Sequence, residues 1–525
     1  MRPPQDGIPC PDWVKDMADF DLTVRHGTLV TERETARCDV GVRDGRIVAV
    51  EERLPSGRRD IDASGRLVLP GGVDSHCHIE QVSSMGLMCA DDFYSGTVSA
   101  VFGGTTTIIP FAAQHKGRSL LGVADDYARR AAEKAVIDYA FHLIVSDPMP
   151  HALDVELPVL IRRGITSFKV YMTYERLKLD DRQMLDVLAV ADREKALVMV
   201  HAENHEIIEW IAQRLLARGH VAPRFHATSH SPIAESEAAY RAIQLSRILD
   251  VPMLIVHVSA SEAVEAIRAA RRHGARVFAE TCPQYLFLTA SDIDCAGLEG
   301  AKYCCSPPPR DEASQQALWR ALLDGSVELF SSDHAPYRYD ESGKLPHGAK
   351  TTFKQMANGV PGLEVRMPLL FSEGVGKGRL TLNEFVALTA TNHARMYGLR
   401  HRKGTIGVGL DADLAIWDPE KRVVISASML HDSVGYTPYE GRPVTGWPIT
   451  VINRGRVVVD AGALHATRGS GEFLPCAPPG PIESGRELAT EVIALKGLLG
   501  LTDAELRPQA EEDSEPQRSA HAVSH

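Results

Sequence analysis

Two segments near the ends of the chain share a pattern of alternating apolar and polar residues. Residues 20–53 and residues 404–458 both show it, with glycine-containing turns between the alternating stretches. A period of two is typical of short strands that bury one face. We therefore predict that the two segments pair into one small β-sandwich domain built from both termini.

The residues between these segments follow a different rhythm. Apolar, strand-like runs are followed by stretches with helical spacing, such as residues 232–249, opened by Pro232, and residues 261–274, stopped by Gly274. Pro at the first helical position and Gly after the last one are typical helix boundaries. Strands that alternate with helices predict an α/β fold, a parallel (β/α)8 TIM barrel. The eight runs begin near Leu67, Thr105, Tyr139, Thr166, Leu197, Met253, Arg276 and Glu328.

These patterns divide the chain into four parts. A further helix is predicted at Thr381, where Glu384 completes a capping box. After the β segments, residues 476–485 resemble a linker, residues 486–500 have helical spacing, and residues 507–525 have the polar composition of a disordered tail. The predicted parts are the first portion of the β-sandwich domain at 1–68, the barrel at 69–400, the second portion of the β-sandwich domain at 401–465, and a C-terminal extension at 466–525.

Composition narrows the class of protein. Of the 525 residues 44% are hydrophobic, and no stretch approaches the roughly 18 unbroken apolar residues of a membrane span. A formal net charge of −12 without a basic cluster argues against nucleic acid and anionic membranes as partners. The nine cysteines form no CxxC pair, and residues 1–16 contain no apolar run like that of a secretory signal. We therefore expect a cytoplasmic globular enzyme.

Six polar residues fall at the ends of predicted barrel strands. His76 and His78 end the first strand and, being two residues apart, share one face, whereas Cys77 points away. A barrel gathers its functional groups at the carboxyl ends of its strands, so these side chains are expected to meet. Imidazole and carboxylate groups are common ligands of divalent metals. The six residues are His76, His78, Lys169, His201, His257 and Asp333.

Each of these residues also has a structural interpretation. Lys169 lies within the apolar stretch ITSFKVYMTY, where burying a bare ammonium is costly, so it either reaches solvent at a strand end or takes part in chemistry. A lone His is often a hydrogen-bonded structural residue, and Asp333 alone could cap a helix. Glu203 and Asn204 are either partners of His201 or plain loop residues. The coincidence of all six at equivalent strand ends nevertheless favours a site.

The order of the six residues resembles that of the amidohydrolase superfamily. Within it, the dihydropyrimidinase and hydantoinase family has similar motifs over roughly residues 20 to 460: GGVDSHCHIE, DDFYSGT, GGTTTIIPFA, SFKVYMTY, VHAEN, SPPPR, NGVPGLE and GTIGVGLDADLAIWDP. The resemblance implies two divalent metal ions, with Zn²⁺ preferred over Mn²⁺ or Co²⁺. It implies that CO₂ converts the amine of Lys169 into a carbamate that bridges both ions. The ligands it implies are His76, His78 and Asp333 for one metal, and His201 and His257 for the other.

The same resemblance implies a reaction. A hydroxide bridging the metals attacks a ring amide, while Asp333 takes its proton and passes it to the leaving nitrogen. The hydroxyl of Tyr174 stabilises the oxyanion, and backbone groups at Ser306 and Asn358 bind the ureide or imide edge of the substrate. Alone, Tyr174 is equally compatible with a core aromatic, and the other two with ordinary loops. The product is the N-carbamoyl amino acid of a hydantoin or a 5,6-dihydropyrimidine, and the enzyme is expected to be a homo-oligomer, a tetramer or a dimer.

Two loops depart from the family pattern. EQVSSMGLMCADDF, after the His-x-His motif, lacks a proline and is longer, and FAAQHKGRS places Gln114 and His115 where we expect the pocket mouth. Because such loops contact the substituent of the ring, a cyclic imide or an allantoin-like ring stays an alternative. Dihydroorotate would need a cation, for which these loops offer Lys116 and Arg118. Non-catalytic scaffold proteins of this family are a further alternative, but they lack the metal ligands that this chain keeps.

Overall fold

The computed structural model describes residues 19–483 and 490–501. The chain forms two compact units, Met1–Gly485 and Arg486–His525. In the second unit the described residues form helix α17 (Thr490–Leu498), within the stretch predicted to be helical. The predictions for residues 1–16 and 507–525 lie outside the described residues. Every helix in the described part of the chain is too short or too polar to span a bilayer.

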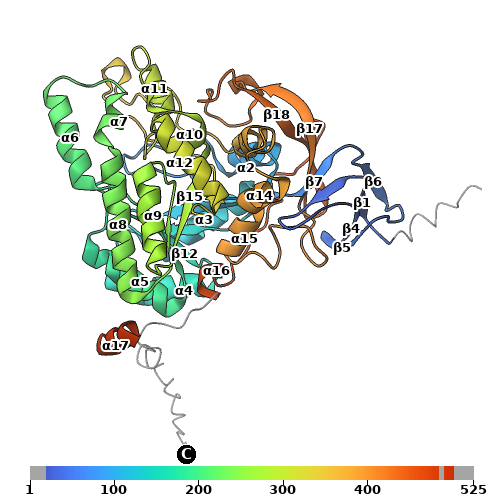
Figure 1. Cartoon of the computed structure of the whole chain (residues 1–525), viewed down its shortest axis with the longest axis horizontal. Coiled ribbons are helices and arrows are strands. Elements are labelled where there is room, and N and C mark those ends of the chain that lie inside the picture. The colour runs from blue at the N-terminus through green and yellow to red at the C-terminus, as the bar shows by residue number, and fades with distance from the viewer. Residues whose placement is uncertain (1–18, 484–489, 502–525) are drawn as a thin grey trace, which may run out of the picture. The chain divides into compact units, whose positions relative to one another are not determined.

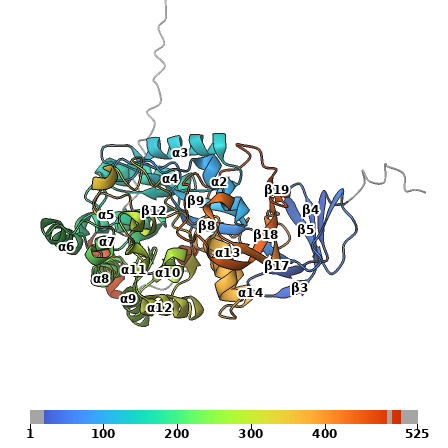
Figure 2. The same ribbon diagram turned by 90° about the horizontal axis from the view of Figure 1, so that it is seen from above.

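The centre of the first unit is a sheet of nine parallel strands that curls into a barrel (Figures 1 and 2). The strands are β8 (Gly72–Cys77), β9 (Thr105–Ala113), β10 (Asp138–Tyr139), β11 (His142–Ile144), β12 (Ser167–Tyr171), β13 (Leu197–His201), β14 (Met253–Ile255), β15 (Val277–Thr281) and β16 (Leu329–Phe330). Their order is β10-β9-β11-β12-β13-β14-β15-β16, and β8 also pairs with β9. The ring closes where the amide of His78 donates to the carbonyl of His334 at 2.7 Å. The predicted TIM barrel is confirmed.

Helices connect these strands or follow the last of them, and those between the strands pack around the outside of the barrel (Figure 1). They are α2 (Phe93–Phe102), α3 (Leu120–Lys134), α4 (Leu157–Arg162), α5 (Asp181–Glu194), α6 (His205–Ala217), α7 (Phe225–Ser229), α8 (Pro232–Leu249), α9 (Ser261–Arg272), α10 (Pro283–Phe287), α11 (Ala290–Ile293), α12 (Glu312–Leu323), α13 (Arg366–Leu370), α14 (Leu382–Val386), α15 (Asn392–Met396) and α16 (Gly480–Glu483). As predicted, Pro232 opens α8, and Thr381 caps α14 in a capping box with Glu384. The predicted linker at residues 476–485 differs, because it contains the single turn of α16.

Both ends of the described chain contribute strands to two further sheets. The strands are β1 (Leu22–Arg25), β2 (Thr28–Val30), β3 (Thr35–Arg37), β4 (Asp39–Arg43), β5 (Arg46–Glu51), β6 (Arg59–Asp62), β7 (Leu67–Pro70), β17 (Leu414–Val424), β18 (Pro443–Asn453), β19 (Arg456–Asp460) and β20 (Ala463–Leu464). One sheet has the order β5-β4-β1-β6, and the other β20-β19-β18-β17-β7-β2-β3. In the second sheet β7 pairs antiparallel with β17, with Pro70 opposite Leu414. This confirms the β domain built from both termini.

The first predicted barrel strand is in fact two strands. The sequence predicts one run from Leu67, but β7 belongs to the β domain and β8 to the barrel, with Gly71 between them. A Cβ atom at Gly71 would lie 2.1 Å from Oγ1 of Thr106, so only glycine lets the chain pass this closely from one sheet to the other. β7 spans residue 68, the predicted end of the first portion of the β domain. The predicted domain boundaries at 68, 400 and 465 stay predictions.

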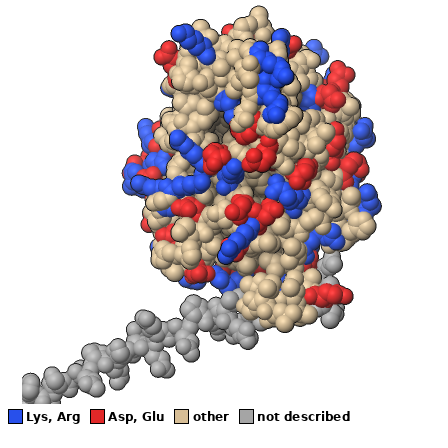
Figure 3. All heavy atoms as spheres, turned by 90° about the vertical axis from the view of Figure 1, so that its left-hand side faces the viewer, with Lys and Arg blue, Asp and Glu red and all other residues tan. Residues whose placement is uncertain are grey.

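Charges of both signs are mixed on the surface. On the face of the described residues drawn in Figure 3, Lys and Arg side chains lie interspersed with Asp and Glu side chains. Exposed ion pairs such as Arg129 with Asp126, 2.8 Å apart, join opposite charges. This face is therefore mixed in sign.

Candidate metal centre and active site

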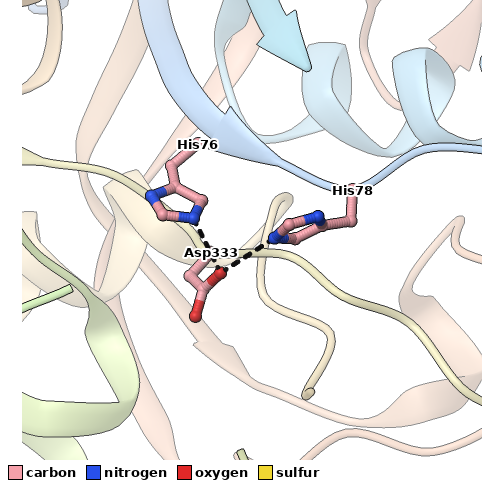
Figure 4. Close-up of side chains that lie close together, drawn as sticks. All are labelled: His76, His78 and Asp333. Atoms are coloured by element: carbon pink, nitrogen blue, oxygen red, sulfur yellow. Dashed lines mark ion pairs between the residues drawn. The ribbon is translucent and has the colours of Figure 1, made fainter. Parts of the chain in front are cut away.

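Two histidines and one aspartate converge at the carboxyl end of the barrel. His76 lies in β8, His78 follows directly after it, and Asp333 follows β16. The Nε2 atoms of His76 and His78 lie 3.1 and 3.4 Å from Oδ1 of Asp333 (Figure 4). One nitrogen or oxygen atom from each residue lies within 4.8 Å of the others. The fold thus brings these three side chains into a group that could hold a metal ion.

Lys169 is buried beside this group. It lies in β12 with 1% of its surface exposed, and its Nζ atom is 2.8 Å from Nε2 of His76. The ammonium also lies over the ring of Phe111, 4.4 Å from the ring centroid. Burial lowers the pKa of Lys169 to about 8, although Asp333 acts in the opposite direction. The alternative in which Lys169 reaches solvent is therefore wrong.

His201 and His257 bring two further imidazoles to the same place. Their ring centroids lie 4.5 Å apart, and the ring of His257 lies 5.3 Å from that of His76. Burial lowers the pKa of both side chains, so both are neutral at pH 7, the form of imidazole that binds metals. The buried Nδ1 atom of His257 has no hydrogen-bond partner among the described residues. Both histidines line a cavity together with Lys169 and Asp333.

Hydrogen bonds fix the orientation of the histidines from β8. Nδ1 of His76 donates to Glu280 at 2.5 Å, and Nδ1 of His78 donates to Gln81 at 2.9 Å, so that Nε2 of each ring faces the centre. Outer partners of this kind hold the tautomer and orientation of metal ligands. Glu280 is not among the site residues predicted from the sequence, although a carboxylate within the apolar stretch VFAET is the same kind of signal as Lys169.

The two residues of interest after His201, Glu203 and Asn204, have different roles. Oε2 of Glu203 lies 2.8 Å from Nε2 of His201, and Oε1 lies 2.8 Å from Nδ1 of His230. Glu203 is therefore a partner of His201. Asn204 instead caps α6, where its side chain accepts a hydrogen bond from the amide of Ile207 at 3.1 Å.

Three of the predicted site residues have a left-handed backbone. The φ angle is 67° at Tyr174, 41° at His257 and 47° at Asp333. A non-glycine residue costs about 1–3 kcal/mol in this region, and such residues cluster at functional sites. Burial raises the pKa of Asp333, but the charge and hydrogen bonds of His76 and the hydrogen bond of His78 hold it well below its usual value. The aspartate is therefore an ionised acceptor.

Tyr174, Ser306 and Asn358 face the same cavity as the histidines. Burial raises the pKa of Tyr174, and hydrogen bonds with Ser306 and Asn358 only partly offset this effect, so the hydroxyl stays protonated. Oγ of Ser306 lies 3.2 Å from Nε2 of His226. Oδ1 of Asn358 is buried without a hydrogen-bond partner among the described residues, and an unsatisfied amide of this kind costs about 1–3 kcal/mol. It is therefore a candidate contact for a ligand.

The cavity at the metal-binding group is small, with a volume of about 80 Å³. A second cavity of about 300 Å³ shares the lining residues Ser84, Met85, Tyr174 and Asn358 with it. Ser84 and Met85 belong to the loop whose sequence departs from the family pattern. The space next to the site is therefore shaped in part by residues of this loop.

The second unusual loop does not reach this space. Oε1 of Gln114 accepts hydrogen bonds from the amides of Ser146 and Asp147, at 3.1 and 3.0 Å. Neither Gln114 nor His115 is among the described residues that line the two cavities. Gln114 is instead bound to the segment that follows β11, and the prediction that Gln114 and His115 reach the pocket mouth is wrong.

Comparison with known proteins gives a consistent result. Residues 67–458 match the model of the amidohydrolase family. The chain is 41% identical to a D-hydantoinase of Ralstonia pickettii over 456 residues, which cover 87% of this chain and 98% of the relative. A solved D-hydantoinase structure superposes with a TM-score of 0.85 at 40% identity, covering 88% of this chain and all of the other. A dihydropyrimidinase from Brevibacillus agri NCHU1002 superposes with a TM-score of 0.84 at 40% identity, covering 87% and 99% of the two chains.

Proposed function

The chain belongs to the amidohydrolase family, and from that premise we propose that it opens the ring of a hydantoin or a 5,6-dihydropyrimidine to give an N-carbamoyl amino acid. The enzyme is a hydrolase of cyclic amides. We propose in addition which ring it opens and which role each site residue has. The observation that carries it is the convergence of His76, His78 and Asp333 beside a buried lysine. A cyclic imide or an allantoin-like ring is the alternative substrate.

The family and the His-His-Asp group indicate that the enzyme uses a divalent metal. We assign two ions, Zn²⁺ before Mn²⁺ or Co²⁺, because neutral imidazoles and carboxylates suit all three. Burial lowers the pKa of His78 to about 4, which supports a neutral ligand. When bound, such ions lower the pKa of water and polarise a carbonyl group. The assigned ligands are His76, His78 and Asp333 for one ion, and His201 and His257 for the other, with Lys169 shared.

The shared ligand is a modified lysine in this proposal. The neutral amine of Lys169 adds through nitrogen to the carbon of CO₂ and loses one proton, which gives a carbamate with two oxygen atoms. The complete burial of this amine next to His76 supports the assignment, because a coordinated anion removes the cost of a buried cation. An amine with a pKa of about 8 also supplies some of its neutral form at pH 7.

Side chains of the protein move the proton and hold the substrate. Asp333 takes the proton of the attacking water and delivers it to the ring nitrogen as the amide bond breaks, first as general base and then as general acid. Tyr174 donates a hydrogen bond to the carbonyl oxygen as negative charge develops there. Backbone groups at Ser306 and Asn358 hold the ureide or imide edge. Side-chain Oδ1 of Asn358, which has no hydrogen-bond partner among the described residues, supports a further polar contact at this edge.

We also propose where the enzyme is located in the cell and that it forms a homo-oligomer. A cytoplasmic location is supported by the free cysteines of the described residues, such as Cys77, Cys304 and Cys305. A homo-oligomer, a tetramer or a dimer, follows from the family resemblance. Light scattering of the purified protein would measure the assembly directly.

The experiment that tests the function is a substrate panel on the purified protein. Hydantoin, 5-phenylhydantoin, dihydrouracil and succinimide are assayed for ring opening, and the metal content of the same sample is determined. We expect opening of the first three rings at about two metal ions per chain. Opening of succinimide alone would favour the cyclic imide alternative. Absence of opening after reconstitution with Zn²⁺ or Mn²⁺ and bicarbonate would overturn the proposal.

A further inference from the structure

A second fully buried lysine lies outside the metal-binding group. Lys344 has no exposed surface, and it belongs to the loop after β16, in the sequence DESGKLPHG, which is typical of an exposed turn. Burying an ammonium is costly unless all of its donors are satisfied. The groups that contact the ammonium of Lys344 therefore indicate its role.

Three main-chain carbonyls satisfy this ammonium. Nζ of Lys344 donates to the carbonyls of Cys304, Ala357 and Gly359 at 2.7, 2.8 and 2.5 Å. Each of the three N–H donors of the ammonium thus has one acceptor. Burial lowers the pKa of Lys344 to about 8, so the group keeps its charge at pH 7. Lys344 and these three carbonyls are called the Lys344 clamp below.

The clamp joins the two loops that border the substrate cavity. Cys304 lies two residues before Ser306, and Ala357 and Gly359 flank Asn358. Ser306 and Asn358 both line the cavity next to the metal-binding group. Besides Lys344, a hydrogen bond from the amide of Gly359 to the carbonyl of Cys304, at 3.0 Å, links the two loops at this point.

The loop at Asn358 is held on its other side as well. The amide of Ala335 donates to the carbonyl of Val360 at 3.1 Å. A Cβ atom at Gly359 would lie 2.4 Å from Cβ of Ala335, so the two segments are in close contact. The position of Asn358 is therefore fixed between Ala335, two residues after Asp333, and the ammonium of Lys344.

We propose that Lys344 is a positioning residue for substrate binding, which sets the distance between the backbone groups of Ser306 and Asn358 through the Lys344 clamp. This inference rests on the proposed function, in which those groups hold the polar edge of the ring. Three carbonyl dipoles that converge on one point repel one another once the cation between them is removed. Loss of the clamp therefore moves the loops apart while the metal ligands keep their own contacts.

The test compares Lys344→Met with Lys350→Met in the metal-loaded enzyme. Methionine removes the charge and the donors but keeps most of the length, and Lys350 is an exposed lysine of the same loop. We expect the KM of Lys344→Met to rise about tenfold while kcat changes by less than about threefold, because contacts made equally in the ground and transition states are lost. Metal content should not change. An unchanged KM, or a fall in kcat with loss of metal at constant KM, would overturn the inference.

Hydrogen exchange gives a second readout that does not depend on activity. The amide of Gly359 should exchange about tenfold faster in Lys344→Met than in Lys350→Met, because its acceptor loop is released. Exchange in α8 should be the same in both variants. If the wild-type enzyme opens none of the rings, the proposed function fails. The exchange rates at Gly359 in the two variants would still show whether Lys344 holds the two loops together. Equal exchange at Gly359 in both variants would overturn it.

Chemical rescue covers the case in which Lys344→Met does not fold. Lys344→Ala is prepared in the presence of propylammonium, which replaces the atoms removed beyond Cβ. We expect propylammonium to restore KM toward the wild-type value, and 1-propanol, with one donor, to be without effect. Equal effects of the two additives would contradict the role of a three-donor cation.

Discussion

At the scale of single residues, Lys169 has the most direct consequences for the proposed metal site. Its amine is buried next to His76 and faces the same cavity as Asp333. If a carbamate on this side chain holds both ions, Lys169→Ala should lose bound metal and nearly all activity. Addition of acetate or propionate should restore part of both, because a short carboxylate supplies the two missing oxygens. Metal analysis and ring opening measure this, and full activity in the plain variant would exclude the bridging carbamate.

Tyr174 allows the catalytic role to be separated from metal binding. Tyr174→Phe removes one hydroxyl from the cavity and leaves the aromatic ring in place, with its centroid 5.3 Å from that of His201. We expect both metals to stay bound and kcat to fall about 10²–10³-fold, because a hydrogen bond to the developing oxyanion is lost. Steady-state kinetics on a sample of known metal content would test this. Unchanged turnover would remove Tyr174 from the oxyanion role.

Glu280 contacts the site through two hydrogen bonds, one from Nδ1 of His76 and one from the amide of His257, at 3.3 Å. Glu280→Gln keeps the size of the side chain but weakens its hydrogen bond to Nδ1 of His76. Such outer partners contribute about 10–100-fold in metal affinity, so the variant should lose metal to a competing chelator at a correspondingly lower concentration. Glu312→Gln, at an exposed position in α12, is the matched control. Equal chelator sensitivity in the two variants would contradict the orienting role of Glu280.

Three buried ionisable residues, Lys169, Glu280 and Lys344, differ in how well the local sequence predicts them. Lys169 interrupts an apolar strand, and Glu280 does the same in VFAET, so a polar residue in a buried strand is a usable signal in both cases. Lys344 gives no such signal, because its loop is polar and its burial depends on three carbonyls from distant segments. Local sequence predicts which residues of a strand are unusual, but not which loop residue the fold will enclose.

At the scale of elements, the junction between β7 and β8 is the most constrained. Gly71→Ala would place a Cβ atom 2.1 Å from Oγ1 of Thr106, between two strands that cannot separate easily. We expect a loss of about 1–3 kcal/mol or more in unfolding free energy, as for other overpacked sites. Gly407→Ala is the control, because the nearest contact of its Cβ would be an ordinary 3.6 Å to Leu410. Thermal melting of both variants measures the difference, and equal melting temperatures would contradict a steric constraint at Gly71.

Some boundaries of helices and strands are set by local sequence, and others by contacts with distant segments. The start of α8 at Pro232 and the capping box at Thr381 are local features, and the sequence predicts both correctly. The break at Gly71 lies within one apolar run, so periodicity alone predicts a single strand there. The break exists because Pro70 pairs with Leu414, a long-range contact that a local sequence pattern does not predict.

At the scale of the whole molecule, metal binding and folding should be coupled. The proposed ligands come from five strands of the barrel, so the site exists only in the folded chain. A chelator should abolish ring opening and lower the melting temperature, and Zn²⁺ with bicarbonate should restore both. Metal at a hundredfold excess over its Kd stabilises the folded state by about 2.7 kcal/mol. Calorimetry with and without chelator measures this, and an identical melting temperature would contradict metal binding to the folded state.

The pairing of Pro70 with Leu414 also sets an order of events during synthesis on the ribosome. Polypeptides emerge with the N-terminus first, and domains fold as their residues become available. β7 leaves the ribosome early, but its neighbour β17 emerges only after the entire barrel has been made. The strand that leads directly to His76 and His78 can therefore pair early with β2 but lacks β17 until the barrel strands have been made. The sheet that holds β7 can therefore be completed only after all of the barrel strands have been synthesised.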